Sequence, residues 1–453
     1  NHNVYIGACI ASNVSCTNQG NHNIGMGFGS INGLTSGSCN ISFGYEAGYW
    51  SSGSRNIAMG RNSQGAPSTG GDNVALGHCS LKTNSSGSNN IALGCKSALS
   101  LTSGSDNIAL GQLAMGTGTI TGSGNIALGE NALRNETAGL CNIAMGHDAM
   151  CISAGADCNV VLGVNAGKNL STAQTNIFLG HYAGCGFTTG SSNIVIGDAA
   201  GTGTANKTGD DNVAIGSCTM QALTSGVKNT FLGFHAGVYN TEGGYNVFIG
   251  CGAGKLNTTG QGSIFIGRNA GDANCGGEYS IIIGQSAGTT GTAICDNIII
   301  GREAGYAGSL TGKYNTIIGM QAGCDVTSGE YNTILGHCAG SNLTSGDDNV
   351  TIGHGANQTG VTTGDDNVFV GNYAGDNNSS GACNVLIGHH AGKLHTTGNC
   401  NVAIGHCADY KNCTGRGNVM LGSCAGKCND DRNSNVFIGA SAGKYAYDGD
   451  ENK

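Results

Sequence analysis

Proline and charged residues are the scarcest features of this sequence. Pro67 is the only proline, and charged residues make up 10% of the chain, against about 25% in an average globular protein. Disordered chains carry more charge, and collagen requires much more proline, so both classes are excluded. The sequence therefore favours an ordered chain.

Two kinds of segment are also missing. The chain has a net charge of −9 and no cluster of Lys or Arg residues, so we expect no binding of nucleic acid. No apolar run approaches the roughly 20 residues of a membrane helix, so we expect no membrane insertion. Because the chain begins at Asn1 inside a repeat-like segment, we expect it to be a processed or partial piece of a longer protein.

What the sequence has in excess is glycine, at 83 of 453 residues, and a repeat. The motif Asn-x-x-x-Gly occurs 26 times, mostly 17 residues apart, from Asn3 to Gly439. Ser263 and Ser280 replace the asparagine in two copies. With this first residue as position 1, position 2 is Val, Ile or Thr, position 4 is always apolar and position 5 is always Gly.

This repeat predicts an all-β protein, a parallel β-solenoid (β-roll) of about 26 coils with a 17-residue period. β-branched residues favour strands, and Gly permits a tight corner. We expect each coil to hold a short strand, a corner, a second short strand and a polar loop, stacked every ~4.8 Å into a rod about 125 Å long. We assign residues 1–443 to one continuous array and 444–453 to a polar tail.

The alternation of the strand predicts which side chains are buried. Positions 2 and 4 point to the same side, which we expect to be the inside, and position 3 points away from it. The asparagine at position 1 predicts a ladder of side-chain amides from coil to coil. The alternative is a simple turn residue.

Position 3 becomes bulky and apolar in the later coils. A row of such side chains on the outside would exceed the apolar surface of a soluble monomer, so we expect it to contact another copy of the chain. The predicted subunit-interface residues are Phe178, Phe231, Phe248, Phe265, Ile282, Ile299, Ile317, Ile334, Phe369 and Phe437.

With these motifs in view, the chain resembles the head repeats of trimeric autotransporter adhesins. The matching segments are Asn73-Val74-Ala75-Leu76-Gly77, Asn212-Val213-Ala214-Ile215-Gly216 and Asn401-Val402-Ala403-Ile404-Gly405. Ile-Gly-x-x-Ala-Gly arrays of this kind are also similar to parts of viral tail fibres and of large secreted proteins. The resemblance implies a trimeric, surface-displayed β-roll that binds host or matrix ligands.

Cysteine is abundant, with 21 residues, which suggests an oxidising, extracellular compartment. Residues at one phase of neighbouring coils lie within reach of a disulfide. The predicted pairs are Cys141–Cys158, Cys383–Cys400, Cys407–Cys424, Cys79–Cys95 and Cys413–Cys428.

Sequons for N-glycosylation recur along the chain, and the alternative is that Asn and Thr are ordinary loop residues. The candidate acceptors are Asn13, Asn84, Asn135, Asn169, Asn206, Asn257, Asn342, Asn357, Asn378 and Asn412.

Other polar motifs have weaker implications. Histidines recur at position 6, and the pairs His337/His354 and His389/His406 should stack as outward polar residues, with a metal site as the alternative. Asp347 and Asp365 fall in adjacent coils, where calcium is conceivable. Apart from that calcium, we expect no cofactor. Acidic groups and histidines are scattered without a divergent segment to build a pocket, so we expect no enzyme.

These observations favour a structural subunit of a fibre or filament that is extracellular, on a cell surface or on a virion surface. Such a subunit would self-associate as a homo-oligomer, for instance a trimer, or as a head-to-tail filament. The alternative is an adhesin head that binds a host glycan or protein. A more remote alternative is an ice-binding solenoid, based on Ser/Thr rows such as Thr362-Thr363.

Overall fold

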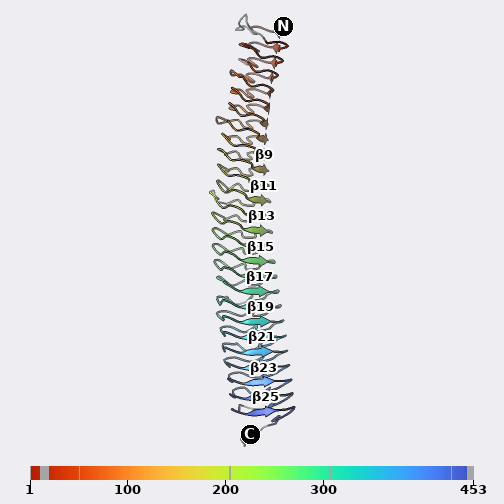
Figure 1. Cartoon of the computed structure of the whole chain (residues 1–453), viewed down its shortest axis with the longest axis vertical. Coiled ribbons are helices and arrows are strands. Elements are labelled where there is room, and N and C mark those ends of the chain that lie inside the picture. The colour runs from red at the N-terminus through yellow and green to blue at the C-terminus, as the bar shows by residue number, and fades with distance from the viewer. Residues whose placement is uncertain are drawn as a thin grey trace. The chain divides into compact units, whose positions relative to one another are not determined.

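The structure is a computed structural model that describes residues 2–10, 20–49, 52–203, 206–306, 308–429 and 431–445. Most of the predicted polar tail therefore lies outside the described residues. Contacts divide the chain into two units, Asn1–Val227 and Lys228–Lys453. Each unit is a parallel β-solenoid with a period of about 17 residues, and the described residues contain no helix (Figure 1). The predicted fold class is confirmed.

Each coil contributes one three-residue strand, at positions 2 to 4 of the repeat. The strands of the first unit are β1 (Val4–Ile6), β2 (Ile24–Met26), β3 (Ile41–Phe43), β4 (Ile57–Met59), β5 (Val74–Leu76), β6 (Ile91–Leu93), β7 (Ile108–Leu110), β8 (Ile126–Leu128), β9 (Ile143–Met145), β10 (Val160–Leu162), β11 (Ile177–Leu179), β12 (Ile194–Ile196) and β13 (Val213–Ile215). Those of the second are β14 (Thr230–Leu232), β15 (Val247–Ile249), β16 (Ile264–Ile266), β17 (Ile281–Ile283), β18 (Ile298–Ile300), β19 (Thr316–Ile318), β20 (Thr333–Leu335), β21 (Val350–Ile352), β22 (Val368–Val370), β23 (Val385–Ile387), β24 (Val402–Ile404), β25 (Val419–Leu421) and β26 (Val436–Ile438).

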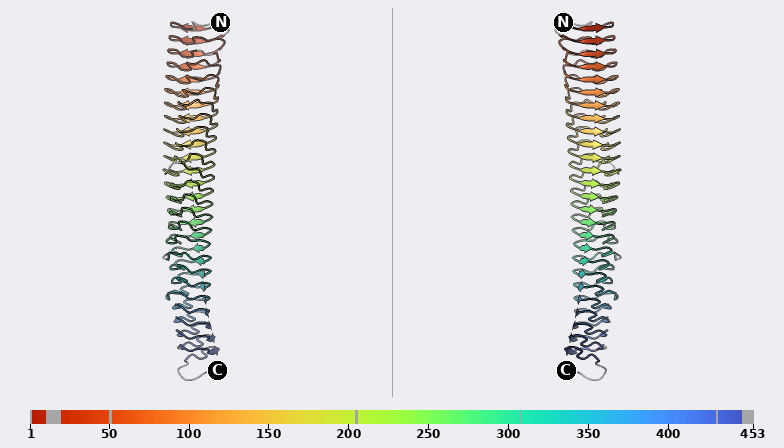
Figure 2. Two further views of the ribbon diagram at one scale, coloured as in Figure 1. Left: turned by 90° about the vertical axis from the view of Figure 1, so that its left-hand side faces the viewer. Right: turned by 90° about the vertical axis from the view of Figure 1, so that its right-hand side faces the viewer.

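The strands of each unit pair in parallel and in phase. In β15 and β16, for example, Val247 pairs with Ile264, and Phe248 pairs with Phe265. Within each unit the strand arrows point the same way in both views of Figure 2. Because the register joins like positions of the repeat, any residue type repeated at one position forms a column along the sheet.

The second strand that we expected in each coil is not formed. Positions 7 and 9 adopt positive φ angles, as at Cys79 (φ 59°) and Leu81 (φ 50°). A strand cannot continue through left-handed residues. Outside the strands, the described residues pair only at isolated bridges such as Leu101 with Ile120.

The predicted facing of the strand is wrong, because position 3 points into the coil. All the residues predicted to form a subunit interface are buried in their own unit, and Phe437 at the last coil is the most exposed of them at 8%. These corrected residues are Phe178, Phe231, Phe248, Phe265, Ile282, Ile299, Ile317, Ile334, Phe369 and Phe437. Positions 2 and 4 lie on the outside instead, as in β15, where Phe248 is buried and Val247 and Ile249 are partly exposed.

Position 9 explains why position 3 fits inside. In most coils with a bulky position 3, position 9 is glycine: a Cβ on Gly254 would come 2.5 Å from the Phe248 ring. In most coils with a small position 3, position 9 carries a side chain, as in the buried pair Ala75 and Leu81. The two positions share one volume of the core, so the interior stays filled although its residues change from coil to coil.

The asparagine ladder is confirmed. Asn107 Nδ2 donates to Asn90 Oδ1 (3.1 Å) and to Gly122 O (3.0 Å), and the Asn107 backbone N–H donates to Asn90 Oδ1 (3.0 Å). At the two serine coils, Ser280 Oγ donates to Ile294 O (3.0 Å) and accepts the Asn297 N–H (3.2 Å). The side chain at position 1 thus ties each strand to its neighbour and to the loop.

Candidate interaction surface

The outer face of the sheet is apolar in all but three coils. It consists of positions 2 and 4, the first and last residues of each strand given above, and we call it the outer sheet face. Thr230, Thr316 and Thr333 are its only polar residues, and none of its residues is charged. Its side chains are partly exposed, for example 43% at Leu232 and 44% at Leu335, and those of the last strand reach 67% at Ile438. Each unit therefore presents two adjacent columns of aliphatic side chains to its surroundings.

The area of this face lies at the upper end of the apolar patches of monomers and approaches that of a protein interface. Strands lie about 4.8 Å apart, and positions 2 and 4 of one strand are about 7 Å apart. With side-chain width, each coil adds roughly 50 Å² of footprint, and one unit roughly 600 Å². A standard interface occupies about 800 Å² per partner, and the largest apolar patch of a typical monomer is about 300–600 Å². The outer sheet face is therefore a candidate site of association.

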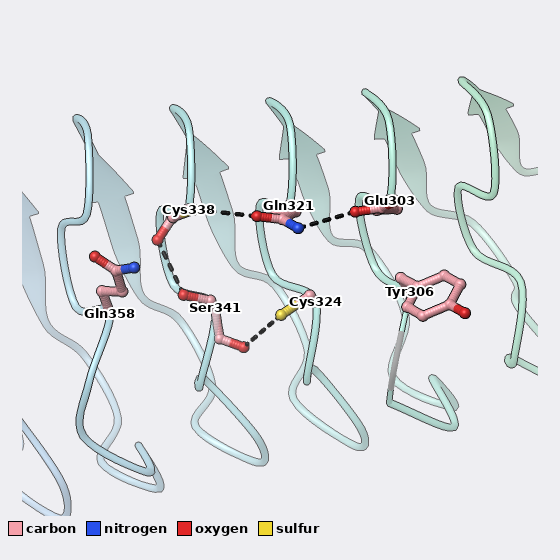
Figure 3. A pocket seen from close by; sticks show the side chains of 7 residues that line it. All are labelled: Glu303, Tyr306, Gln321, Cys324, Cys338, Ser341 and Gln358. Carbon is pink, nitrogen blue, oxygen red and sulfur yellow. Dashed lines mark hydrogen bonds between the residues drawn. The ribbon is translucent and has the colours of Figure 1, made fainter.

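A second candidate site is a hollow of about 410 Å³ in the second unit (Figure 3). It lies between two ridges that run along the coils after β18, β19, β20 and β21. Position 7 supplies one ridge and position 10 the other. The residues that line it are Glu303, Gln321 and Cys338 on the first ridge and Tyr306, Cys324, Ser341 and Gln358 on the second.

Hydrogen bonds between successive coils hold these polar groups in place. Gln321 Nε2 donates to Glu303 Oε2 (2.9 Å), and the Cys338 thiol donates to Gln321 Oε1 (3.6 Å). The hydroxyl of Ser341 donates to Cys338 O (3.1 Å), and the Cys324 thiol donates to Ser341 O (3.4 Å). The first ridge is thus a chain of bonded side chains with the Glu303 carboxylate at one end, as Figure 3 shows.

The thiols of the hollow are poor nucleophiles. Burial, together with the nearby Asp325 carboxylate, raises the pKa of Cys324 to about 11. Burial also raises the pKa of Cys338. Since the thiolate is the nucleophile and the metal ligand, both cysteines are in the unreactive form at neutral pH. Sequence reasoning missed this hollow, because its residues come from variable positions of the repeat and follow no motif.

The structure shows no disulfide among the described cysteines. Three of the predicted pairs, Cys141–Cys158, Cys383–Cys400 and Cys407–Cys424, lie in register, as the neighbouring strand pairs require. Partial desolvation raises the pKa of the Cys383 thiol, and the adjacent Cys400 thiol adds to the effect.

The other two predicted pairs are out of register. Cys95 aligns with His78 rather than with Cys79, and its sulfur lies 3.8 Å from His78 Nδ1. Lys411 N–H donates to Lys427 O (3.2 Å), which places Cys413 two residues out of phase with Cys428. Register therefore disfavours Cys79–Cys95 and Cys413–Cys428 as disulfides.

We expect oxidation of the intact protein with diamide to form the three in-register disulfides. Each closes a loop of 17 residues, which should stabilise the local fold by about 3 kcal/mol. Peptide mapping under non-reducing conditions identifies the pairs, and the heat-induced unfolding of oxidised and reduced protein measures the gain. Predominant linkage of Cys79 to Cys95 would show that the register is different.

The predicted glycosylation sites differ in whether the acceptor asparagine is buried or exposed. A glycan requires the amide nitrogen to reach solvent, so the prediction is contradicted at five fully buried acceptors, namely Asn84, Asn257, Asn357, Asn378 and Asn412. Asn169 and Asn342 are partly buried, and their Nδ2 atoms donate to Cys185 O (2.8 Å) and Gln358 O (2.6 Å). Asn135 and Asn206 are exposed, and Asn13 lies outside the described residues.

The predicted histidine stacks are confirmed. The rings of His337 and His354 stack with centroids 5.0 Å apart, and those of His389 and His406 with centroids 5.3 Å apart. Among the described residues, no three His, Cys, Asp or Glu side chains are grouped so as to hold a metal ion.

The aspartates proposed for calcium make backbone contacts instead. Asp365 Oδ1 accepts the Asp347 N–H (2.9 Å), and Asp347 Oδ1 accepts the Glu330 N–H (2.8 Å). The Ser/Thr rows are used similarly: Thr344 Oγ1 donates to Thr362 O (3.1 Å). These side chains link successive loops, which explains their preference at these positions.

Comparison with family models and with curated sequences identifies no relative of the chain. No family model matches the chain, and no curated protein matches it in sequence. Within the described ranges, no helix has the length and apolar character that a membrane crossing requires.

Proposed function

We propose that the protein is a structural subunit of a fibre or filament, extracellular or on a virion surface, in which copies associate through the outer sheet face. The observation that carries this proposal is the absence of charge from that face in all 26 strands. A solvent-facing sheet normally alternates apolar and polar sides, and strands apolar on both sides are normally covered on both. A second copy presents the same apolar columns at the same spacing, so it is the partner that fits.

Three other features support a structural role. Within each unit, backbone hydrogen bonds and the side chains at position 1 link successive coils, which suits a load-bearing shaft. The cysteines of the hollow have raised pKa values, which opposes nucleophilic chemistry. The in-register cysteines and the exposed sequons at Asn135 and Asn206 support an oxidising, glycosylating route outside the cytosol.

Charge placed on the outer sheet face tests the proposal. Ile266 and Ile283 occupy position 4 of neighbouring strands. The double variant Ile266→Lys/Ile283→Lys should weaken self-association about 1,000-fold or more, because like charges would meet across the interface and cost several kcal/mol. Sedimentation velocity measures the assembly, and circular dichroism checks the fold.

A matched control carries the same added charge on the loops. Ser328 and Ser345 are exposed loop residues of neighbouring coils, and Ser328→Lys/Ser345→Lys should assemble like the unchanged chain. A mass of three copies would favour the trimer, and open-ended particles would favour the filament. A monomeric unchanged protein, or a face variant that still assembles, would overturn the proposal.

A further inference from the structure

We infer that the hollow between Glu303 and Gln358 is a binding site for a neutral oligosaccharide. This inference goes beyond the proposed fibre, because the hollow lies on the ridges of positions 7 and 10 and not on the outer sheet face. Its volume of about 410 Å³ is within the range of pockets that hold small ligands, about 300–1,000 Å³. It also supports the adhesin as a second function of the same chain.

The two ridges supply the groups that recognise hydroxyls. Glu303 offers carboxylate oxygens as acceptors, and its bond from Gln321 (2.9 Å) fixes their direction. Ser341 donates its proton to Cys338 O (3.1 Å), so its oxygen presents lone pairs. The amide of Gln358 supplies both donors and acceptors. A sugar carries several hydroxyls that each donate and accept, which matches this mixed lining.

Tyr306 supplies the apolar side of the site. The residue is 43% exposed at one end of the hollow, and Figure 3 shows its ring beside Cys324 on the second ridge. An exposed tyrosine combines an apolar ring face with a polar hydroxyl. The C–H faces of a pyranose ring can pack on such a ring while the sugar hydroxyls reach the polar ridge.

The first ridge ends at Gly355, which has no side chain and so leaves space for the Gln358 amide. Gly355 occupies position 7 in the coil that follows Cys338, and a Cβ there would lie 2.7 Å from Gln358 Oε1. The absence of a side chain lets the Gln358 amide lie over the backbone at this end of the hollow. The site is thus bounded by Tyr306 at one end and by Gln358 at the other.

The charge of the lining selects the ligand class. Glu303 is the only charged residue among those that line the hollow. A carboxylate repels sialylated or sulfated sugars, because like charges are unfavourable at close range. A second hollow, of about 400 Å³, is lined by Tyr239, Lys255, Leu256, Thr258 and Cys275. It has one amine and no carboxylate, so it lacks the acceptor pattern and serves as an internal comparison.

Binding of the full chain to an immobilised panel of neutral oligosaccharides, with sialylated and sulfated counterparts, tests the inference. We expect retention by at least one neutral oligosaccharide and a weaker response to its acidic counterpart. Tyr306→Ala and Gln321→Ala should each reduce affinity at least tenfold in titration calorimetry. Tyr239→Ala, which alters the comparison hollow, should bind like the unchanged chain.

The outcomes distinguish this inference from the proposed fibre. Sedimentation of Tyr306→Ala should match that of the unchanged chain, because Tyr306 lies outside the outer sheet face. The inference is overturned if no neutral oligosaccharide binds, if only acidic ones bind, or if Tyr306→Ala binds as tightly as the unchanged chain.

Discussion

Replacement of Asn107 by aspartate should destabilise the coils around it by about 3–5 kcal/mol, the cost of an unpaired buried charge. Asn107 is 1% exposed, and its Nδ2 donates to Asn90 Oδ1 (3.1 Å) and Gly122 O (3.0 Å). Aspartate would place carboxylate oxygen against both acceptors. Two attractive contacts would become repulsive in a buried site.

Serine at the same position is the matched control. The chain itself uses Ser280, whose hydroxyl still reaches a loop carbonyl at 3.0 Å. Asn107→Ser should therefore cost only about 1–2 kcal/mol, because a loop bond is retained. A long repeat array does not unfold as a single two-state unit. Hydrogen exchange of the amides between residues 90 and 142 therefore reports the local free energy, and equal effects of Asp and Ser would contradict the ladder's role.

The shared core volume leads to the second large prediction. Phe248→Ala should destabilise the fold by about 3–5 kcal/mol, because a large cavity forms. Its ring stacks between Phe231 and Phe265, with centroids 5.0 and 4.7 Å apart. Gly254→Leu alone should be similarly damaging, since its Cβ would lie 2.5 Å from the same ring.

The double variant Phe248→Ala/Gly254→Leu should recover at least about 2 kcal/mol of the summed loss, which is a typical coupling between residues in contact. Ala75 with Leu81 already forms this arrangement, and Leu81 holds a φ of 50° against 56° at Gly254. Hydrogen exchange of the unchanged chain and the three variants completes a double-mutant cycle. Additive losses would mean that positions 3 and 9 do not share one volume.

Several features were predictable because they depend on spacing alone. The 17-residue period places the same residue types at equal intervals, and stacking them aligns the strands in register and pairs asparagines such as Asn90 and Asn107. The histidine stacks follow from the same register. The hollow was not predictable, because Glu303 and Gln358 come from coils whose loop positions vary.

The sequence by itself determined the fold class, the register and the ladder. Each follows from the spacing of the repeat and does not depend on which side chains are buried. Only the tertiary structure decided which side of the strand is the interior. Alternation with a period of two divides a strand into two sides but does not say which is covered. That choice depends on residues across the coil, where Gly254 makes room for Phe248 and thereby leaves Val247 and Ile249 facing outward.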